Sequence, residues 1–192
     1  RVLERIGEKK IVSSLLPIDT NHVTERFSDK TVNEIVKAAS EMSRAKTGAL
    51  IVIEQNVRLD EYERTGIVID SVLTSQILIN IFEHNTPLHD GAVIVRGNRI
   101  TAATCYLPLS DNMLLSKELG TRHRAGVGIS EVTDSLTVIV SEETGAISVA
   151  YKGELMRKLT AEELKKLLVM AQNKTAAQKK FRLWKGWNKN EI

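Results

Sequence analysis

The sequence predicts an α/β domain built on a mixed β-sheet. Its 192 residues suffice for one domain with a proper core and are few for two. The run 49–53 is continuously apolar, which is typical of a strand that is covered on both faces, and 136–140 reads as a further strand. Elsewhere the apolar residues recur at the spacing of a helix face, so helices are expected to alternate with the strands.

The first helix is expected over residues 31–42, with Ser28 or Asp29 as its cap and Gly48 at the position of a helix-ending glycine. The other elements, in chain order, are a strand at 49–53, a strand at 66–70, a helix that is capped by Thr74 or Ser75 and closed by residues 85–87, hairpin strands at 91–95 and 100–107, a helix within 113–130, hairpin strands at 136–140 and 146–150, and a helix opened by the capping box 160–163.

The net charge of +3 comes from 27 basic and 24 acidic residues and lies in the two ends of the chain. Residues 1–10 carry four basic and two acidic side chains, and residues 174–192 carry six and one, which leaves 17 basic and 21 acidic side chains between them. The middle of the chain is therefore mildly acidic, and no nucleic-acid partner is expected.

Cys105 is the single cysteine, which excludes a disulfide framework, and its strand-like setting favours a buried thiol over a nucleophile.

No apolar run approaches the ~20 residues that a membrane-spanning helix needs. The chain begins at Arg1 rather than Met, which suggests that a segment precedes it in the native protein.

The sequence 88–95 places a histidine and an aspartate before a glycine and an apolar run. An aspartate at the start of a strand is held by the sheet and still reaches solvent, so Asp90 can bind a metal ion or take a proton. His89 is a candidate second ligand, and Gly91 lets a ligand approach the backbone because it has no Cβ. The alternative is an ordinary Asp-Gly turn before a strand.

A basic cluster with glycines at both ends, residues 120–126, follows thirty residues later. The guanidinium of Arg122 matches phosphate oxygens, and Thr121 can donate a hydrogen bond to them. His123 either contacts phosphate or packs within the motif. The alternative is a solvated basic turn.

The turn 141–144 joins two strongly predicted strands and carries Ser141 and Glu143, which can reach phosphate and metal or simply form a polar hairpin. The sequence contains no P-loop, no Gly-x-Gly-x-x-Gly and no Gly-x-Ser-x-Gly motif, which argues against the enzyme classes that use them.

Together, Asp90-Gly91-Ala92 and Arg122-His123-Arg124 resemble, in order and spacing, the DGA and RHR motifs of the diadenylate cyclase (DAC) domain. The resemblance extends from about Thr31 to about Leu159 and includes 48–52, 80–82 and 141–145. It implies the DAC-domain fold, a central mixed sheet surrounded by helices, and the condensation of two ATP into cyclic di-AMP.

The resemblance also implies a role for each site residue. The implied catalytic residues are Asp90, Arg122 and His123. The implied ATP-binding residues are Gly91, Ala92, Leu107, Thr121, Arg122, Ser141 and Glu143. The implied ligands of a divalent metal (Mn²⁺, Mg²⁺ or Co²⁺) are His89, Asp90 and Glu143.

Within the family, the chain resembles the membrane-anchored cyclases of Gram-positive bacteria. They imply a linker at 1–28 that follows a missing transmembrane region, a catalytic domain at 29–172 and a basic tail at 173–192, at the cytoplasmic face of the membrane. They also imply a catalytic homodimer, a membrane regulatory protein and a phosphoglucosamine mutase as partners. Two other functions stay open, a degenerate nucleotide-binding sensor and a metal-dependent phosphohydrolase.

Overall fold

The computed structural model describes residues 25–113, 115–116 and 119–172, so the segment 1–24 and the basic tail 173–192 lie outside the described residues. Within these ranges seven strands form one mixed sheet in the order β2-β4-β3-β1-β5-β6-β7. The elements are α1 (Asp29–Ala45), β1 (Ala49–Ile53), α2 (Asp60–Glu63), β2 (Ile67–Val72), α3 (Ser75–Phe82), β3 (Ala92–Arg96), β4 (Arg99–Cys105), α4 (Thr121–Val132), β5 (Leu136–Val140), β6 (Ile147–Tyr151), β7 (Glu154–Met156) and α5 (Ala161–Gln172).

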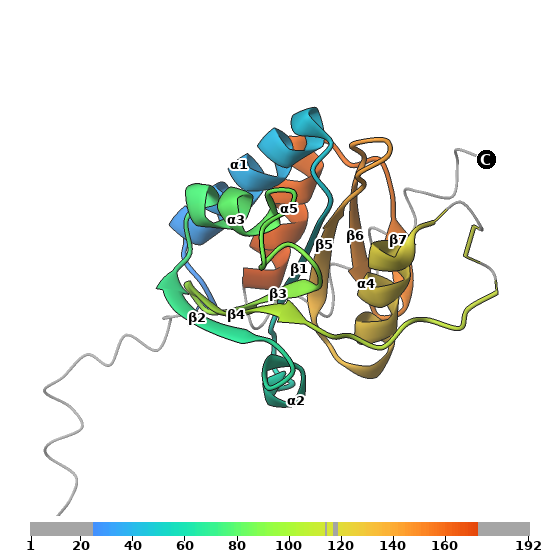
Figure 1. The fold of residues 1–192 in the computed structure, drawn as a ribbon, viewed down its shortest axis with the longest axis horizontal. Coiled ribbons are helices and arrows are strands. Elements are labelled where there is room, and N and C mark those ends of the chain that lie inside the picture. Colours follow the sequence, from blue (N-terminus) through green and yellow to red (C-terminus); the bar gives the residue numbers. More distant parts are fainter. Residues whose placement is uncertain (1–24, 114, 117–118, 173–192) are drawn as a thin grey trace, which may run out of the picture.

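Helices cover both faces of this sheet, which confirms the predicted α/β class. Helices α1, α3 and α5 group on one face, and α4 lies on the other (Figure 1). Strand β1 shows why its sequence is apolar throughout, because Ile51 contributes to the core under α1 and Val52 to the core under α4. Phe27 is 2% exposed and joins the core under α1, so the residues just before that helix pack on the domain.

The strand register brings three separate segments to one end of the sheet. Strand β1 pairs in parallel with β3, with Ile51 opposite Val93, and antiparallel with β5, with Ala49 opposite Val140. The residue before β1, the residues before β3 and the turn after β5 therefore meet at the same end. We call this the upper end, because β1 descends from it in Figure 1.

Both predicted hairpins are present, and several element boundaries differ from the prediction. Strands β3 and β4 pair antiparallel, as do β5 and β6. The first helix ends at Lys46, whose φ of 54° is left-handed and whose N–H bonds the carbonyls of Met42 and Ser43. The prediction that Gly48 ends this helix is therefore wrong. The short elements α2 and β7 were not predicted, because four and three residues carry too little periodicity.

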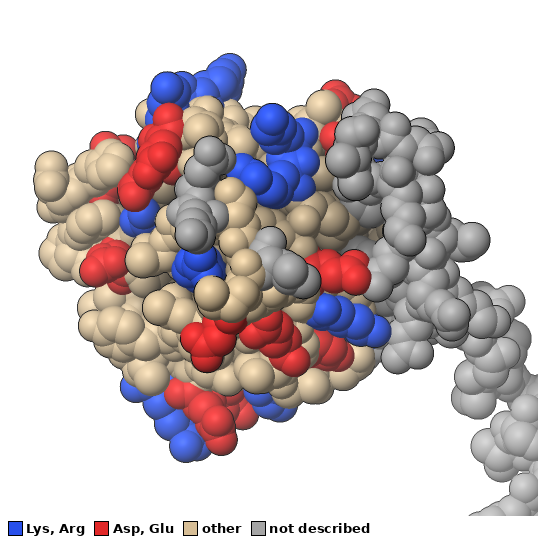
Figure 2. Space-filling model, turned by 90° about the vertical axis from the view of Figure 1, so that its right-hand side faces the viewer, with Lys and Arg blue, Asp and Glu red and all other residues tan. Residues whose placement is uncertain are grey.

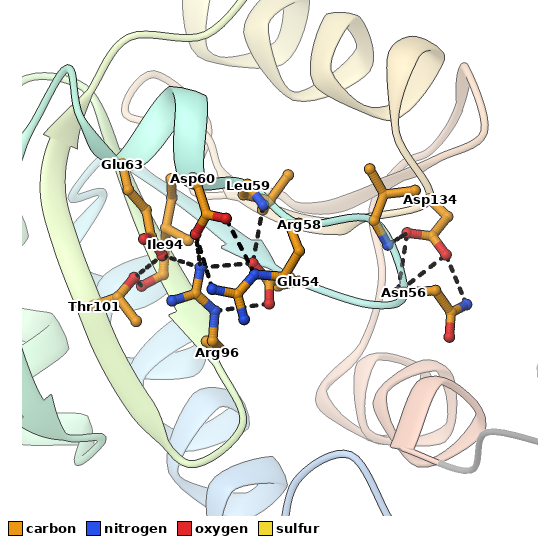
Figure 3. A network of polar contacts seen from close by, with 11 residues as sticks. Glu54, Asn56, Arg58, Leu59, Asp60, Glu63, Ile94, Arg96, Thr101 and Asp134 are labelled. Atoms are coloured by element: carbon orange, nitrogen blue, oxygen red, sulfur yellow. Dashed lines mark hydrogen bonds and ion pairs between the residues drawn. The ribbon is translucent and has the colours of Figure 1, made fainter.

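The lower end of the sheet is closed by a network of charged side chains (Figure 3). Glu54, which follows β1 and is 7% exposed, accepts two hydrogen bonds from Arg96 at 2.7 and 2.9 Å and one from the N–H of Leu59. Arg96 also pairs with Asp60 and Glu63 of α2. The hydrogen bonds to Glu54 raise the pKa of Arg96 above its usual value. The network thus fixes α2 to the sheet.

Replacing Arg96 by methionine should lower the free energy of unfolding by roughly 2–3 kcal/mol, because it leaves the buried Glu54 carboxylate without a counter-charge. Urea denaturation measures the change. The matched control is Arg58→Met, which removes an exposed guanidinium from the same network and should leave stability nearly unchanged. Equal losses in the two variants would contradict a special role for the buried pair.

Candidate active site

A pocket of about 390 Å³ opens at the upper end of the sheet, between the start of α4 and the turn after β5. Its lining comes from four segments and consists of Leu119, Gly120, Thr121, Arg122, His123, Val140, Ser141, Glu142, Glu143, Thr144, Ala146, Ser148 and Arg157. The structure thus brings together two motifs that lie twenty residues apart in the sequence. Its size is that of a small-molecule site.

Arg122 is the most constrained side chain of this pocket. Its Nη1 donates to Glu142 Oε2 at 2.7 Å, and its Nε is buried with no hydrogen-bond partner among the described residues. Gly48 allows this placement, because a Cβ there would lie 2.8 Å from Arg122 Nη1. The close approach of the guanidinium, rather than a helix end, explains this glycine.

The first turn of α4 adds anion-binding groups beside Arg122. Gly120 is the N-cap and provides no side-chain hydrogen bond. Its carbonyl accepts from the N–H groups of His123 and Arg124, whereas those of Thr121 and Arg122 have no backbone acceptor within the described part of the chain. Helix N-termini with free N–H groups attract phosphate.

The turn 141–145 forms the opposite wall and is held from two sides. Ser141 Oγ accepts a hydrogen bond from the N–H of Thr144, and Ser43 of α1 donates to the carbonyl of Gly145 at 2.6 Å. Gly145 has φ +75°, and a Cβ there would lie 2.4 Å from the Ser43 carbonyl oxygen. The end of α1 thereby positions the turn, while Glu143 remains exposed.

The Asp-Gly-Ala segment lies at the same end of the sheet but outside this pocket. Asp90 is exposed, and no hydrogen bond or ion pair engages its carboxylate within the described ranges. Gly91 has φ +110°, and a Cβ there would lie 2.8 Å from the carbonyl carbon of Thr104. The glycine is thus required by its conformation and by the close approach of β4, a reason that adds to the expectation that it makes room for a ligand.

The other predicted residues near this segment are partly or fully buried. Ala92 is fully buried in the core under α4, so its side chain faces no ligand, and Leu107 is half-buried against that core. Cys105 is 1% exposed, and burial raises the pKa of its thiol to about 12, which confirms a structural thiol.

The residues proposed for a metal do not form a preassembled cluster: no three His, Cys, Asp or Glu side chains converge among the residues that the structure describes. The donors nevertheless suit an ion that also binds substrate phosphates, as Mg²⁺ does with one or two carboxylates. His89 Nδ1 donates to the carbonyl of Thr86 at 2.6 Å. This contact orients the ring by its Nδ1, the kind of outer hydrogen bond that a metal-binding histidine usually makes.

Sequence reasoning included Glu142 only as part of the polar turn and missed Ser148 and Arg157. Both line the pocket, and the register of β5, β6 and β7 places them there. Figure 2 shows the side of the molecule that carries α4, with basic side chains mainly in its upper half and a band of acidic ones below. Charge is therefore mixed on this side, and recognition depends on individual residues.

His123 should make stability depend on pH. The imidazole is 7% exposed, and burial lowers its pKa below the ordinary 6.5, with a further contribution from Arg157. Below pH 6.5 the unfolded chain binds a proton that the folded chain does not, so the free energy of unfolding should fall as pH decreases from that value. Denaturation between pH 7 and about 5 measures this slope, above the range in which carboxylates titrate.

The control is His123→Gln, which should flatten this slope, whereas the exposed His84→Gln should keep it. A slope that survives His123→Gln would show that another group is responsible.

Comparison with known proteins identifies the family. The model of the DAC family, described as DisA bacterial checkpoint controller nucleotide-binding, matches residues 36–155. The cyclic di-AMP synthase CdaA of Bacillus subtilis is 53% identical over 169 residues, which are 88% of this chain and 60% of CdaA. A diadenylate cyclase of Listeria monocytogenes is 51% identical over 188 residues, 97% of this chain and 67% of that protein. The chain thus spans about three fifths to two thirds of the length of these relatives.

Solved structures agree with this relationship. A double mutant of DacA from Staphylococcus aureus is 50% identical, with a TM-score of 0.73, over 74% of this chain and 95% of that one. A protein of Bacillus cereus described as a hypothetical membrane spanning protein is 43% identical, with a TM-score of 0.66, over 68% of this chain and 64% of that one. With matching motifs, sheet and relatives, the chain belongs to the DAC family of nucleotide-binding domains.

Proposed function

We propose that this chain is the catalytic part of a diadenylate cyclase, which converts two ATP into cyclic di-AMP and two pyrophosphates. The observation that carries the proposal is the meeting of Asp90 and the Arg122 pocket at one end of the sheet. Asp90 precedes β3, and the turn that lines the Arg122 pocket follows β5; these two strands flank β1 and are ~10 Å apart at the usual strand spacing. A nucleotide can span this distance with its ribose at one side and its phosphates at the other.

In the reaction, the ribose 3′-oxygen of one ATP forms a bond to the α-phosphorus of the other. The bond from that phosphorus to the β-phosphate oxygen breaks, and pyrophosphate leaves with the electron pair. Asp90 takes the proton of the 3′-hydroxyl, since its carboxylate is exposed and lies beside the backbone turn at Gly91. Arg122, Thr121 and the N-terminus of α4 hold the phosphates.

Other predicted residues complete this site. A divalent metal held by Asp90, His89 and Glu143 together with the phosphates would supply charge neutralisation at the reacting phosphorus. Ser141 adds a hydroxyl from the turn, and neutral His123 packs behind the phosphates. Gly91, Ala92 and Leu107 border the nucleoside, with Ala92 contributing backbone only.

Two copies of the chain must act together, because each 3′-hydroxyl attacks the nucleotide bound by the other copy. Their contact is face to face about a two-fold axis. Large apolar side chains beside the site support this assembly: Tyr106, Leu109 and Met113 are 73%, 56% and 91% exposed. They follow β4, whose Cys105 pairs with Ala92 and which therefore ends beside Asp90.

We place the catalytic domain at 29–172 and the whole protein at the cytoplasmic face of a membrane. The name of the Bacillus cereus neighbour, a membrane spanning protein, supports the membrane and not the face. No helix of the described residues is long and apolar enough to cross a bilayer. A membrane regulatory protein and a phosphoglucosamine mutase are the partners that we propose from the resemblance to membrane-anchored cyclases.

The chain incubated with ATP and Mn²⁺ should yield cyclic di-AMP, separable by chromatography, and Asp90→Asn should abolish the product while changing stability by less than ~1 kcal/mol. Asp70→Asn, the same change at a carboxylate that is 72% exposed, should retain full activity. Unchanged turnover in Asp90→Asn would refute the assignment. ATP binding without product in the wild type would indicate a sensor instead, and release of ADP or AMP would indicate a phosphohydrolase.

Specific activity at saturating ATP should rise with protein concentration and reach a plateau as dimers fill. Added Asp90→Asn chain should depress the wild-type rate more than dilution does, because a mixed dimer keeps at most one competent attacking half. Activity that stays flat over a hundredfold concentration range, with sedimentation showing only monomer, would contradict the dimeric mechanism.

A further inference from the structure

Arg157 lines the pocket, and no sequence motif points to it. It follows β7 and lies two residues beyond the stretch that the family model matches. The pocket therefore has two arginines, Arg122 on the first turn of α4 and Arg157 after the last strand of the sheet.

The ladder between β6 and β7 places Arg157 at the pocket. Met156 pairs with Val149, so the next position along the ladder sets Arg157 opposite Ser148, on the face that α4 covers. Ser148 is fully buried and lines the pocket as well. The N–H of Leu159 bonds the carbonyl of Ile147 at 2.9 Å, which holds the chain just after Arg157 against β6.

The two arginines differ in their charge partners. Arg122 is paired with Glu142, whereas no carboxylate lies in ion-pair distance of Arg157 within the described residues. The turn 141–145 also places a second carboxylate, that of Glu143, in the pocket lining. Arg157 is exposed, and its charge reaches the interior of the pocket, because it helps to lower the pKa of His123. It is thus the guanidinium that is free to receive an anion.

The position of Arg157 along the sheet indicates which part of a nucleotide it meets. From Asp90 on β3, the order of strands runs through β1, β5 and β6 to β7. If the ribose lies beside Asp90 and the α-phosphate beside Arg122, the β- and γ-phosphates extend toward β6 and β7. Arg157, which follows β7, lies on this side of the pocket.

We propose that Arg157 binds the β- and γ-phosphates of ATP, the part that leaves as pyrophosphate, and thereby selects triphosphates over monophosphates. This inference rests on the proposed function for the orientation of the nucleotide. The guanidinium meets the terminal phosphate oxygens with paired hydrogen bonds and offsets the charge that develops on the leaving group.

The test compares wild type, Arg157→Gln and the matched control Lys158→Gln, which removes the neighbouring positive charge from a side chain outside the pocket lining. Calorimetric titration with ATP and with AMP, in EDTA so that no turnover occurs, reports the affinities. Arg157→Gln should bind ATP about tenfold more weakly, the loss of one charge-assisted hydrogen bond, and AMP as tightly as wild type. Arg157→Lys should recover part of the loss, and Lys158→Gln should match wild type.

Steady-state cyclic di-AMP synthesis gives an independent readout, in which KM for ATP should rise more than kcat falls. Equal ATP affinity in wild type and Arg157→Gln, in a chain that does make cyclic di-AMP, would overturn this inference and leave the proposed function intact. Equal weakening of ATP and AMP would overturn it too, since that pattern means a contact near the α-phosphate. A wild-type chain that binds no ATP in EDTA and makes no cyclic di-AMP with Mn²⁺ would overturn both.

Discussion

The pairing of β1 with a parallel neighbour on one side and an antiparallel neighbour on the other determines where chemistry can occur. Because β1 and β3 start at the same end at which β5 finishes, Gly48, Asp90 and Ser141 meet there despite their separation in sequence. An all-antiparallel arrangement would send the residues before β3 to the opposite end. The strand directions therefore bring the segments of the site together, and the side chains then determine its chemistry.

The two ends of the sheet use charge in opposite ways. At the lower end Glu54 and Arg96 satisfy one another, and the network is closed around α2. At the upper end Asp90 and Arg157 have no ion-pair partner among the described residues, and N–H groups of the α4 start are free. Polar groups whose hydrogen-bond and ion-pair partners lie within the protein stabilise the fold, whereas polar groups without such partners are available to a ligand.

Much of this arrangement could be predicted from the sequence. Continuous apolar runs gave the central strands, and the placement of Arg122 in a pocket with Ser141 agrees with the motif-based hypothesis. The reasons for the glycines could not be predicted, since the contacts of Gly48 and Gly91 involve residues far along the chain. Arg157 was missed for the same reason, because the three-residue strand before it has no periodicity that a sequence could reveal.

The ion pair between Arg122 and Glu142 has a consequence for which anions the pocket retains. A ligand that takes Arg122 must compete with a carboxylate already bound at 2.7 Å, so part of its attraction is offset by releasing Glu142. A lone phosphate or sulfate gains little from this exchange. A polyphosphate would also reach the start of α4 and Arg157, and these contacts together would outweigh the cost of releasing Glu142. On the proposed function, the ion pair would therefore favour multivalent anions over simple ones in this pocket.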